Sequence, residues 1–248
     1  MKEVIYDFSG KRFVITGASS GMGRQIAMEL AEAGALILGL ARGENKLREL
    51  STLYPMQIKY AACDVTDKEA LEIAVCKFVN ENGKLNGVVH AAGISDITPI
   101  KMYNEKVAHE IMDISFWAGA NLIQICTKNK YGKQGMSNIL FSSICAHSAE
   151  KGMFAYAGAK AALQIGAKSI AKEIAGKHHR INTITPGWVK TNMTDQAAQL
   201  ADLEKFFENN LLGEGSVDDV SGIVLFLLSD RARWITGTDI VVDGGYLA

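Results

Sequence analysis

The stretch Thr16-Gly17-Ala18-Ser19-Ser20-Gly21-Met22-Gly23 sets the interpretation of the whole chain. It follows an apolar run at 12–16, typical of a buried strand, and leads into a segment of helical period at 25–33. The glycine spacing is G-x-x-x-G-x-G, and the three glycines suit a tight turn, a close backbone approach to a ligand, and close helix packing. A helix that begins here offers free N–H groups and a favourable dipole to a phosphate. The candidate phosphate-binding residues are therefore Gly17, Ser19, Ser20, Gly21, Met22 and Gly23.

The rest of the chain repeats the same alternation of apolar runs and helical periods. We expect strands at 12–16, 35–41, 57–64, 85–91, 137–142, 180–185 and 239–242, and helices at 25–33, 45–53, 68–80, 108–128, 156–176 and 217–228. This order predicts right-handed crossovers and a parallel sheet with helices on both faces, an α/β fold in one domain over 1–248. The apolar stripe on 108–128, with Phe116 and Trp117, suits either the core or a subunit interface.

The segment 191–213 interrupts this rhythm after the sixth expected strand. It is polar and partly helical. It would lie over the carboxyl ends of the strands, where ligands bind in sheets of this kind. We expect it to form a lid over the substrate, and an ordinary pair of surface helices is the alternative.

Composition limits the classes of function. The 248 residues are 48% hydrophobic and 21% charged, as in an average globular domain. The 26 basic and 27 acidic residues leave a net charge of −1, which argues against a nucleic acid or an anionic membrane as partner. No secretory signal or membrane span is visible. Four scattered cysteines without a C-x-x-C pair predict reduced thiols, no metal site and a cytoplasmic location.

The end of the second expected strand indicates which dinucleotide is bound. An acidic residue there would hold the ribose hydroxyls of NAD, whereas an arginine accommodates the extra phosphate of NADP. The sequence has Arg42 at this point and no acid before it, and Arg24 and Lys46 would add positive charge. We therefore expect NADP(H). Asp64, followed by Val65, is placed either to meet the adenine amino group or to cap the helix expected at 68–80.

Tyr156 and Lys160 supply a proton donor and a cation four residues apart, on one face of a helix. A free tyrosine has a pKa near 10, and a nearby cation favours the phenolate and lowers that value. Ser143, at the end of the fifth strand, can donate a hydrogen bond to a substrate carbonyl at the same edge of the sheet. A further turn at Pro186-Gly187-Trp188-Val189-Lys190-Thr191 follows the sixth strand and presents backbone groups suited to a carboxamide.

In this combination the chain resembles the short-chain dehydrogenases/reductases over almost its whole length. The matching features are the glycine turn 16–23, His90-Ala-Ala-Gly93, Ser143, Tyr156-x-x-x-Lys160, Pro186-Gly187 and the ending Ile235-Thr-Gly237…Asp243-Gly-Gly245. The resemblance implies a Rossmann-type, doubly wound sheet of seven parallel strands, and a homotetramer.

The resemblance also implies roles for individual residues. Tyr156 is the general acid/base, Ser143 positions the substrate, and Lys160 binds the nicotinamide ribose while lowering the pKa of the tyrosine. The cofactor-binding set further includes Ala91, Ala92, Gly93, Pro186, Gly187, Val189 and Thr191.

Two positions depart from the family pattern. His90 stands where the family has an asparagine that steadies the centre of the sheet, and we expect a ring nitrogen of His90 to donate in its place. Ser115 aligns with the helix asparagine that holds a water in the proton relay behind the lysine. A serine either still binds that water or leaves the relay impaired. Cys145, two residues past Ser143, is expected to line the substrate pocket or to be a small buried residue.

The leading hypothesis is an NADP(H)-dependent reductase of a ketone or 3-oxoacyl group that acts on a small molecule. A sugar or steroid dehydrogenase of the same family fits the motifs as well, whereas a sugar epimerase or dehydratase fits the glycine spacing worse. The alternative from another class is a cofactor-binding regulatory protein whose turnover was lost through Ser115. These motifs do not identify the substrate.

Overall fold

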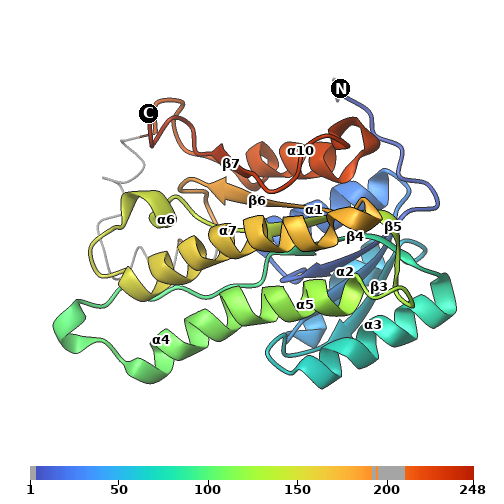
Figure 1. Ribbon diagram of the computed structural model, residues 1–248, viewed down its shortest axis with the longest axis horizontal. Helices are drawn as coiled ribbons and strands as arrows, with labels where there is room; N and C mark the ends of the chain where they lie inside the picture. Colours follow the sequence, from blue (N-terminus) through green and yellow to red (C-terminus); the bar gives the residue numbers. More distant parts are fainter. Residues whose placement is uncertain (1–3, 192–193, 195–209) are drawn as a thin grey trace.

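A single parallel sheet forms the centre of the molecule (Figure 1). The computed structural model describes residues 4–191, 194 and 210–248. The strand order is β3-β2-β1-β4-β5-β6-β7. The strands are β1 (Arg12–Thr16), β2 (Leu36–Ala41), β3 (Ile58–Ala62), β4 (Leu85–His90), β5 (Gly132–Phe141), β6 (Arg180–Pro186) and β7 (Asp239–Val242). Strands β2 and β3 are added on one side of β1, and β5, β6 and β7 are added on the opposite side, beyond β4. The strand order therefore reverses between β1 and β4, and ligands bind at this switch point in doubly wound sheets.

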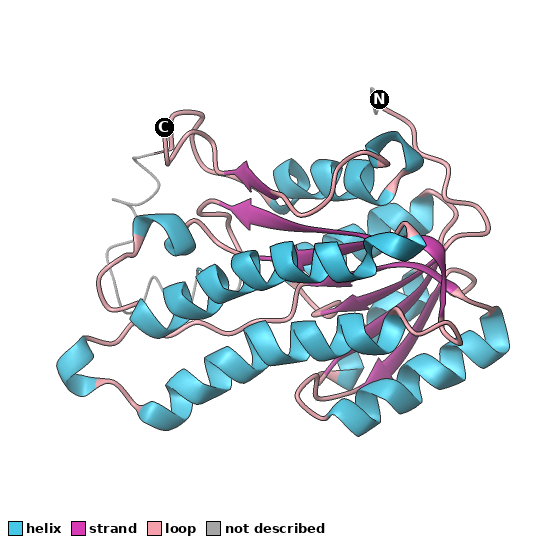
Figure 2. Ribbon diagram, in the orientation of Figure 1, coloured by secondary structure: helices cyan, strands magenta, loops and turns pink. Residues whose placement is uncertain are grey.

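Helices cover both faces of the sheet (Figure 2). Side chains of α1 (Gly21–Glu32), α2 (Glu44–Leu53) and α10 (Val217–Leu228) share one buried cluster with Phe13 and Ile15 of β1. The opposite cluster contains Val14 of β1 together with side chains of three other helices, α3 (Lys68–Asn82), α5 (Ala118–Cys126) and α7 (Phe154–Ile174). Alternate residues of a strand therefore enter opposite cores, as the pleat requires. The expected fold class is confirmed.

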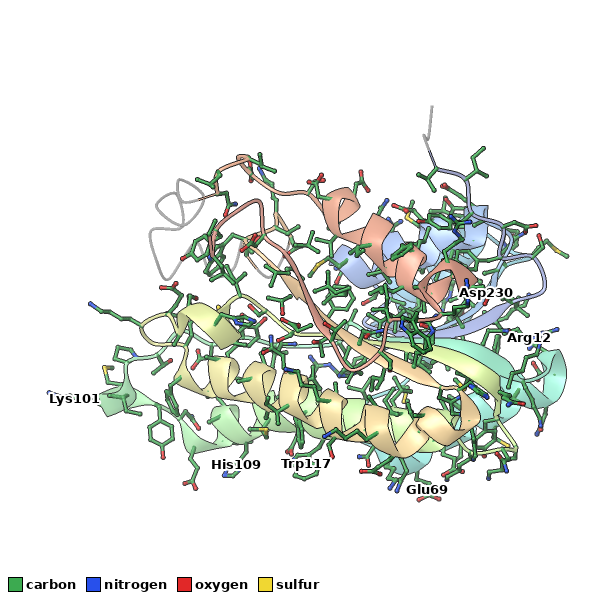
Figure 3. The ribbon with its side chains drawn as sticks, turned by 45° about the horizontal axis from the view of Figure 1, so that its top comes forward. Arg12, Glu69, Lys101, His109, Trp117 and Asp230 are labelled. Carbon is green, nitrogen blue, oxygen red and sulfur yellow. The ribbon has the colours of Figure 1, made fainter. Side chains whose placement is uncertain are left out.

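The long helix expected at 108–128 is divided in the structure. It consists of α4 (Glu105–Met112), a π-helical turn at Asp113–Trp117, and α5. The apolar spacing continues through the turn, so the sequence pattern does not distinguish it from a regular helix. Phe116 packs against the core, whereas Trp117 is 55% exposed and points away from the sheet (Figure 3). The short helix α6 (Cys145–Ser148) was not expected, because four residues are too few to show a period.

Most of the expected lid segment 191–213 lies outside the described residues, which include only 191, 194 and 210–213 of it. In the part of the chain that is described, no helix is both long and apolar enough to span a membrane.

His90 joins the two central strands to the π-helical turn. Its Nε2 lies 3.0 Å from the carbonyl oxygen of Ile114, which can only accept, so Nε2 carries the proton. The hydroxyl of Thr16 then donates to Nδ1 over 2.8 Å, and its oxygen accepts the backbone N–H of Ala92 at 3.3 Å. The expectation that a ring nitrogen of His90 donates at the centre of the sheet is confirmed.

Burial makes the neutral form of His90 the stable one. The ring is 1% exposed. Desolvation, followed by the positive charge of Lys160, lowers the pKa of His90 from its usual 6.5 to about 4. Between these two values the unfolded chain binds a proton at this position that the folded protein excludes. Folding stability therefore rises with pH across this window and is lost as the pH falls from 6.5 toward 4.

Replacing His90 by asparagine tests this account. The lowered pKa corresponds to about 3 kcal/mol of stability that the wild-type protein loses on acidification. His90→Asn removes the titrating group, so its free energy of unfolding should fall less between pH 7 and pH 4. Urea unfolding at several pH values measures the difference, with the exposed His109→Asn as the matched control. Parallel stability curves for wild type and His90→Asn would contradict the assignment.

Candidate active site

A cavity of about 480 Å³ opens beside the glycine turn, at the carboxyl ends of β1, β2 and β4. It brings together residues that are far apart in the sequence. Its lining contains Gly17, Ser19, Ser20, Gly21, Met22, Gly23, Arg42, Asp64, Val65, Ala91, Ala92, Gly93 and Thr191, all expected from the sequence. It also contains Ala41, Gly43, Lys46, Cys63, Ile94 and Ile114. Of these additional residues, only Lys46 was expected from the sequence to contribute to cofactor binding, as a source of positive charge.

Two glycines of the turn sit where no side chain fits. Gly17 has a φ of +69°, and a Cβ there would lie 2.8 Å from the backbone of Ala91 and Ala92. A Cβ at Gly23 would lie 2.5 Å from the carbonyl oxygen of Gly17. The turn therefore packs closely against both the end of β4 and the start of α1, and at these two positions only backbone is present.

The first turn of α1 is suited to an anion. Ser20 is the N-cap residue, but its side chain makes no capping hydrogen bond, and the first turn contains no acidic residue. Backbone N–H groups at such a helix end need an external acceptor. Together with the positive end of the helix dipole they fit a pyrophosphate.

Two basic residues that follow β2 line this cavity. Arg42 and Lys46 both line it, and no ion-pair partner for Arg42 occurs among the described residues. Arg24 is not among the lining residues, and its Nη1 lies 3.2 Å from the sulfur of Met28. The expectation that Arg24 would contribute is therefore not supported.

Asp64 closes a tight turn at the edge of the cavity. Its Oδ1 accepts from the backbone N–H of Thr66 at 2.9 Å and from the Thr66 hydroxyl at 2.8 Å. These two hydrogen bonds lower the pKa of Asp64. The alternative that Asp64 caps the following helix is wrong, because Asp67 is the N-cap and accepts from the N–H of Ala70.

A second, smaller pocket of about 80 Å³ adjoins the first and shares Met22 and Thr191 with it. Its other described lining residues are Ser95, Ser142, Ser143, Ile144, Cys145, Met153, Tyr156, Pro186, Gly187, Trp188, Val189 and Thr194. The structure thus gathers Ser143, Tyr156 and the turn after β6 around one space. Met153 and Trp188 were not identified as site residues, because a buried apolar residue carries no signal that distinguishes a pocket wall from core.

Ser143 and Tyr156 interact directly in this pocket. Burial raises the pKa of Tyr156, the neighbouring Cys145 raises it further, and a hydrogen bond from Ser143 opposes both effects. The Ser143 oxygen also accepts the backbone N–H of Cys145 at 3.2 Å. The phenol is therefore protonated at neutral pH and has a hydroxyl partner that can also reach a ligand.

Lys160 is buried behind the tyrosine. Its Nζ donates to the carbonyl oxygen of Phe141 over 2.7 Å and lies 5.5 Å from the centre of the Tyr156 ring. It is also 3.5 Å from the position that a Cβ would take at Gly93, on the wall of the larger cavity. Burial lowers the pKa of Lys160 to about 8, so it remains an ammonium at neutral pH.

The expectation that Lys160 lowers the pKa of Tyr156 is not met in this geometry. Burial outweighs every opposing effect on the phenol, and the effect that lowers its pKa is the hydrogen bond from Ser143. The physical reason is that the ammonium hydrogen-bonds to Phe141 rather than to the phenol oxygen.

Ser115 lies in the π-helical turn and is fully buried. Its Oγ has no hydrogen-bond partner among the described residues. A buried hydroxyl in this situation is a typical binding site for an internal water. Ile114, its neighbour, both lines the larger cavity and accepts from His90.

The chain is similar to known proteins over almost its whole length. Residues 17–247 match the family model described as "Enoyl-(Acyl carrier protein) reductase". The chain is 34% identical over 246 residues to "3-oxoacyl-[acyl-carrier-protein] reductase FabG" of Rickettsia conorii, covering 97% of this chain and 98% of that protein. It is 29% identical over 253 residues to "L-xylulose reductase" of Caenorhabditis elegans, covering 97% of each chain.

Solved structures of short-chain dehydrogenases/reductases share the fold of this chain. A short-chain type dehydrogenase/reductase from Mycobacterium ulcerans superposes with a TM-score of 0.91 at 28% identity, over 97% of this chain and 91% of the other. A short-chain dehydrogenase/reductase from Brucella melitensis, at 23% identity and a TM-score of 0.92, shares the fold over 98% and 99% of the two chains. The sheet order, the glycine turn and these matches show that the chain belongs to the short-chain dehydrogenase/reductase family.

Proposed function

We propose that the protein is an NADP(H)-dependent oxidoreductase that reduces a ketone or 3-oxoacyl group to an alcohol. One observation carries the proposal: the pocket that contains Ser143 and Tyr156 adjoins the cavity formed by the glycine turn, with Met22 and Thr191 common to both. A carbonyl in the small pocket is thus next to a dinucleotide in the large one.

The residues present fit an NADP cofactor. The uncapped N-terminus of α1 and the close-packed glycines suit its pyrophosphate, and Arg42 with Lys46 suits the additional phosphate. Gly93 lines the larger cavity with Lys160 Nζ 3.5 Å from the position of a Cβ on it, and we assign these two residues to the nicotinamide ribose. Val189 and Thr191 line the small pocket and would hold the carboxamide. When bound, the reduced nicotinamide would supply the hydride.

The protein's own groups would handle the proton. The Tyr156 phenol, kept protonated by burial, donates its proton to the carbonyl oxygen as that oxygen gains negative charge. Ser143 donates a hydrogen bond to the same oxygen and orients it. In this structure the Lys160 ammonium donates to the Phe141 carbonyl, so it would have to turn toward the phenol oxygen to stabilise the phenolate that remains. The buried Ser115 hydroxyl, which has no partner among the described residues, could hold a water that returns a proton to this pair in place of the asparagine.

The lining of the small pocket favours an acyl group over a sugar. None of its described residues is charged or carries a side-chain amide. Ser142 donates to the carbonyl of Lys160, and Thr194 donates to backbone carbonyls, so neither has a free proton to donate to a substrate oxygen. Each hydroxyl of a polyol needs a partner when it is buried. The 3-oxoacyl relative therefore suggests the substrate better than the L-xylulose relative does.

We also propose a homotetramer in the cytoplasm, on the basis of family membership and of four free cysteines that form no disulfide. Light scattering of the purified protein and fractionation of the source cells test these two points.

Replacing Tyr156 by phenylalanine tests the catalytic assignment. Loss of the proton donor should lower kcat for 3-oxoacyl thioester reduction by about 100-fold or more, because general acid catalysis contributes on that order. NADPH binding, followed by fluorescence, should change little. If the wild type binds NADPH but oxidises it with neither carbonyl nor enoyl thioester substrates, the non-catalytic regulatory alternative is favoured instead.

Replacing Arg42 by alanine tests the cofactor assignment. Removing a charge-assisted contact with the extra phosphate should weaken NADPH binding by roughly 10- to 100-fold and leave NADH binding nearly unchanged. Arg48→Ala is the matched control, because Arg48 is an exposed arginine on α2 that pairs with Glu44. Titration of the variants with both cofactors gives the ratio. An unchanged preference in Arg42→Ala would show that the arginine does not select the cofactor.

A further inference from the structure

The C-terminal turn forms a compact junction beside the substrate pocket. The Asp243 carboxylate accepts the backbone N–H of Gly245 through Oδ1 and that of Leu247 through Oδ2, each at 2.9 Å. These two hydrogen bonds fix the direction of Tyr246. Tyr246 and Leu247 pack against the buried cluster that contains Met153, Tyr156 and Trp188. The end of the chain is thus part of the structure around the small pocket.

This turn binds segments on two sides of the pocket. The N–H of Gly187 donates to the carbonyl of Val242 at 2.9 Å, and a Cβ on Gly187 would lie 2.6 Å from the Cα of Asp243. On the other side, the Tyr246 hydroxyl lies 2.8 Å from Oε1 of Glu150 and donates to it. Glu150 belongs to the loop 149–153 that connects α6 to α7 and leads to Tyr156.

The loop 149–153 depends on such contacts for its shape. Ala149 has a φ of 51°, which is unusual for a residue other than glycine, and Gly152 has a φ of 81°. The carbonyl of Gly152 accepts from Thr98, and the carbonyl of Glu150 accepts the N–H of Met153 at 3.1 Å. The loop carries no regular secondary structure that would hold it without these partners.

Met153 at the end of this loop forms part of the pocket wall. Its side chain is buried, and its sulfur lies 3.8 Å from the sulfur of Cys145. It is the only residue of the loop 149–153 that lines the small pocket among the described residues. A shift of the loop therefore changes the pocket mainly through Met153.

We infer that Met153 limits the size of the group beside the reacting carbonyl, and that the Tyr246–Glu150 hydrogen bond is what holds Met153 in place. Met153 is then a specificity-determining residue and Tyr246 a positioning residue. The part of this inference that concerns substrate choice rests on the proposed carbonyl reduction, whereas the part that concerns loop position does not.

The test compares full-length variants on ketone pairs that differ only in the bulk beside the carbonyl. Met153→Ala should raise the ratio of kcat/KM for the bulky over the small ketone by about tenfold, since a few methylene groups in a pocket are worth that much. Tyr246→Phe, which removes only the hydroxyl, should raise the same ratio at least about threefold. NADPH affinity should stay constant in both.

Tyr54→Phe is the matched control. It removes another tyrosine–glutamate hydrogen bond, from Tyr54 to Glu32 at 3.0 Å, at the end of α2 and away from the pocket. A merely structural role for Tyr246 would lower the melting temperature and the activity on both ketones together. An unchanged ratio in Tyr246→Phe, or the same change in Tyr54→Phe, would overturn the inference.

A second readout does not need activity. Cys145 is buried and its sulfur lies 3.8 Å from that of Met153, so a displacement of Met153 would make the thiol more accessible to iodoacetamide. Peptide mass spectrometry should show Cys145 alkylated several-fold faster in Tyr246→Phe than in the wild type or in Tyr54→Phe. Equal rates would overturn the positioning role even if the protein reduces carbonyls. A faster rate in a protein that reduces no carbonyl would uphold the positioning role and reject the proposed function.

Discussion

The carboxyl ends of β1 and β4 approach each other so closely that only glycine fits at position 17, against the backbone of Ala91 and Ala92. Everything at the site is built around this contact. The same two strand ends are tied by the Thr16 hydroxyl, which accepts from Ala92 and donates to His90. His90 in turn holds Ile114 at the π-helical turn. Three walls of the larger cavity are thus connected through one neutral imidazole, which burial protects from protonation near pH 7.

Burial acts in opposite directions on the two reactive groups of α7. It stabilises the uncharged form of each, so the pKa of Tyr156 rises and that of Lys160 falls. The lysine keeps its proton at neutral pH because its pKa falls only to about 8, and its charge is partly satisfied by the Phe141 carbonyl. The pair is therefore a protonated phenol beside an ammonium, rather than a phenolate. A phenol is the form that can donate a proton, and its raised pKa makes it a weaker acid than a free tyrosine.

Regular elements and the groups they carry could be predicted from the sequence, and the reasons are local. β1, β7 and α10 occur where expected, because apolar period and flanking residues such as Ser216 of the α10 capping box set their ends. The same local patterns place Ser143 after β5 and Tyr156 on α7, and the structure brings these two residues together in one pocket. The division of the 108–128 helix and the raised pKa of Tyr156 depend on tertiary contacts and burial, which no local pattern contains. The helix cap at Asp67 is a local hydrogen bond to the N–H of Ala70, so the sequence does contain its signal.

The same distinction explains why motifs identify the chemistry of this chain but not its substrate. A proton donor and its neighbouring cation need a fixed separation. Tyr156 and Lys160 have it because they lie one helical turn apart on α7, within five consecutive residues. The wall of the small pocket needs only volume and an apolar surface, which Met153 and Trp188 provide from segments far apart in the chain. The loop that carries Met153 is joined to the C-terminal turn by the hydrogen bond between Tyr246 and Glu150, which spans 96 residues. Substrate choice can thus change through distant residues while the reactive group on α7 stays the same.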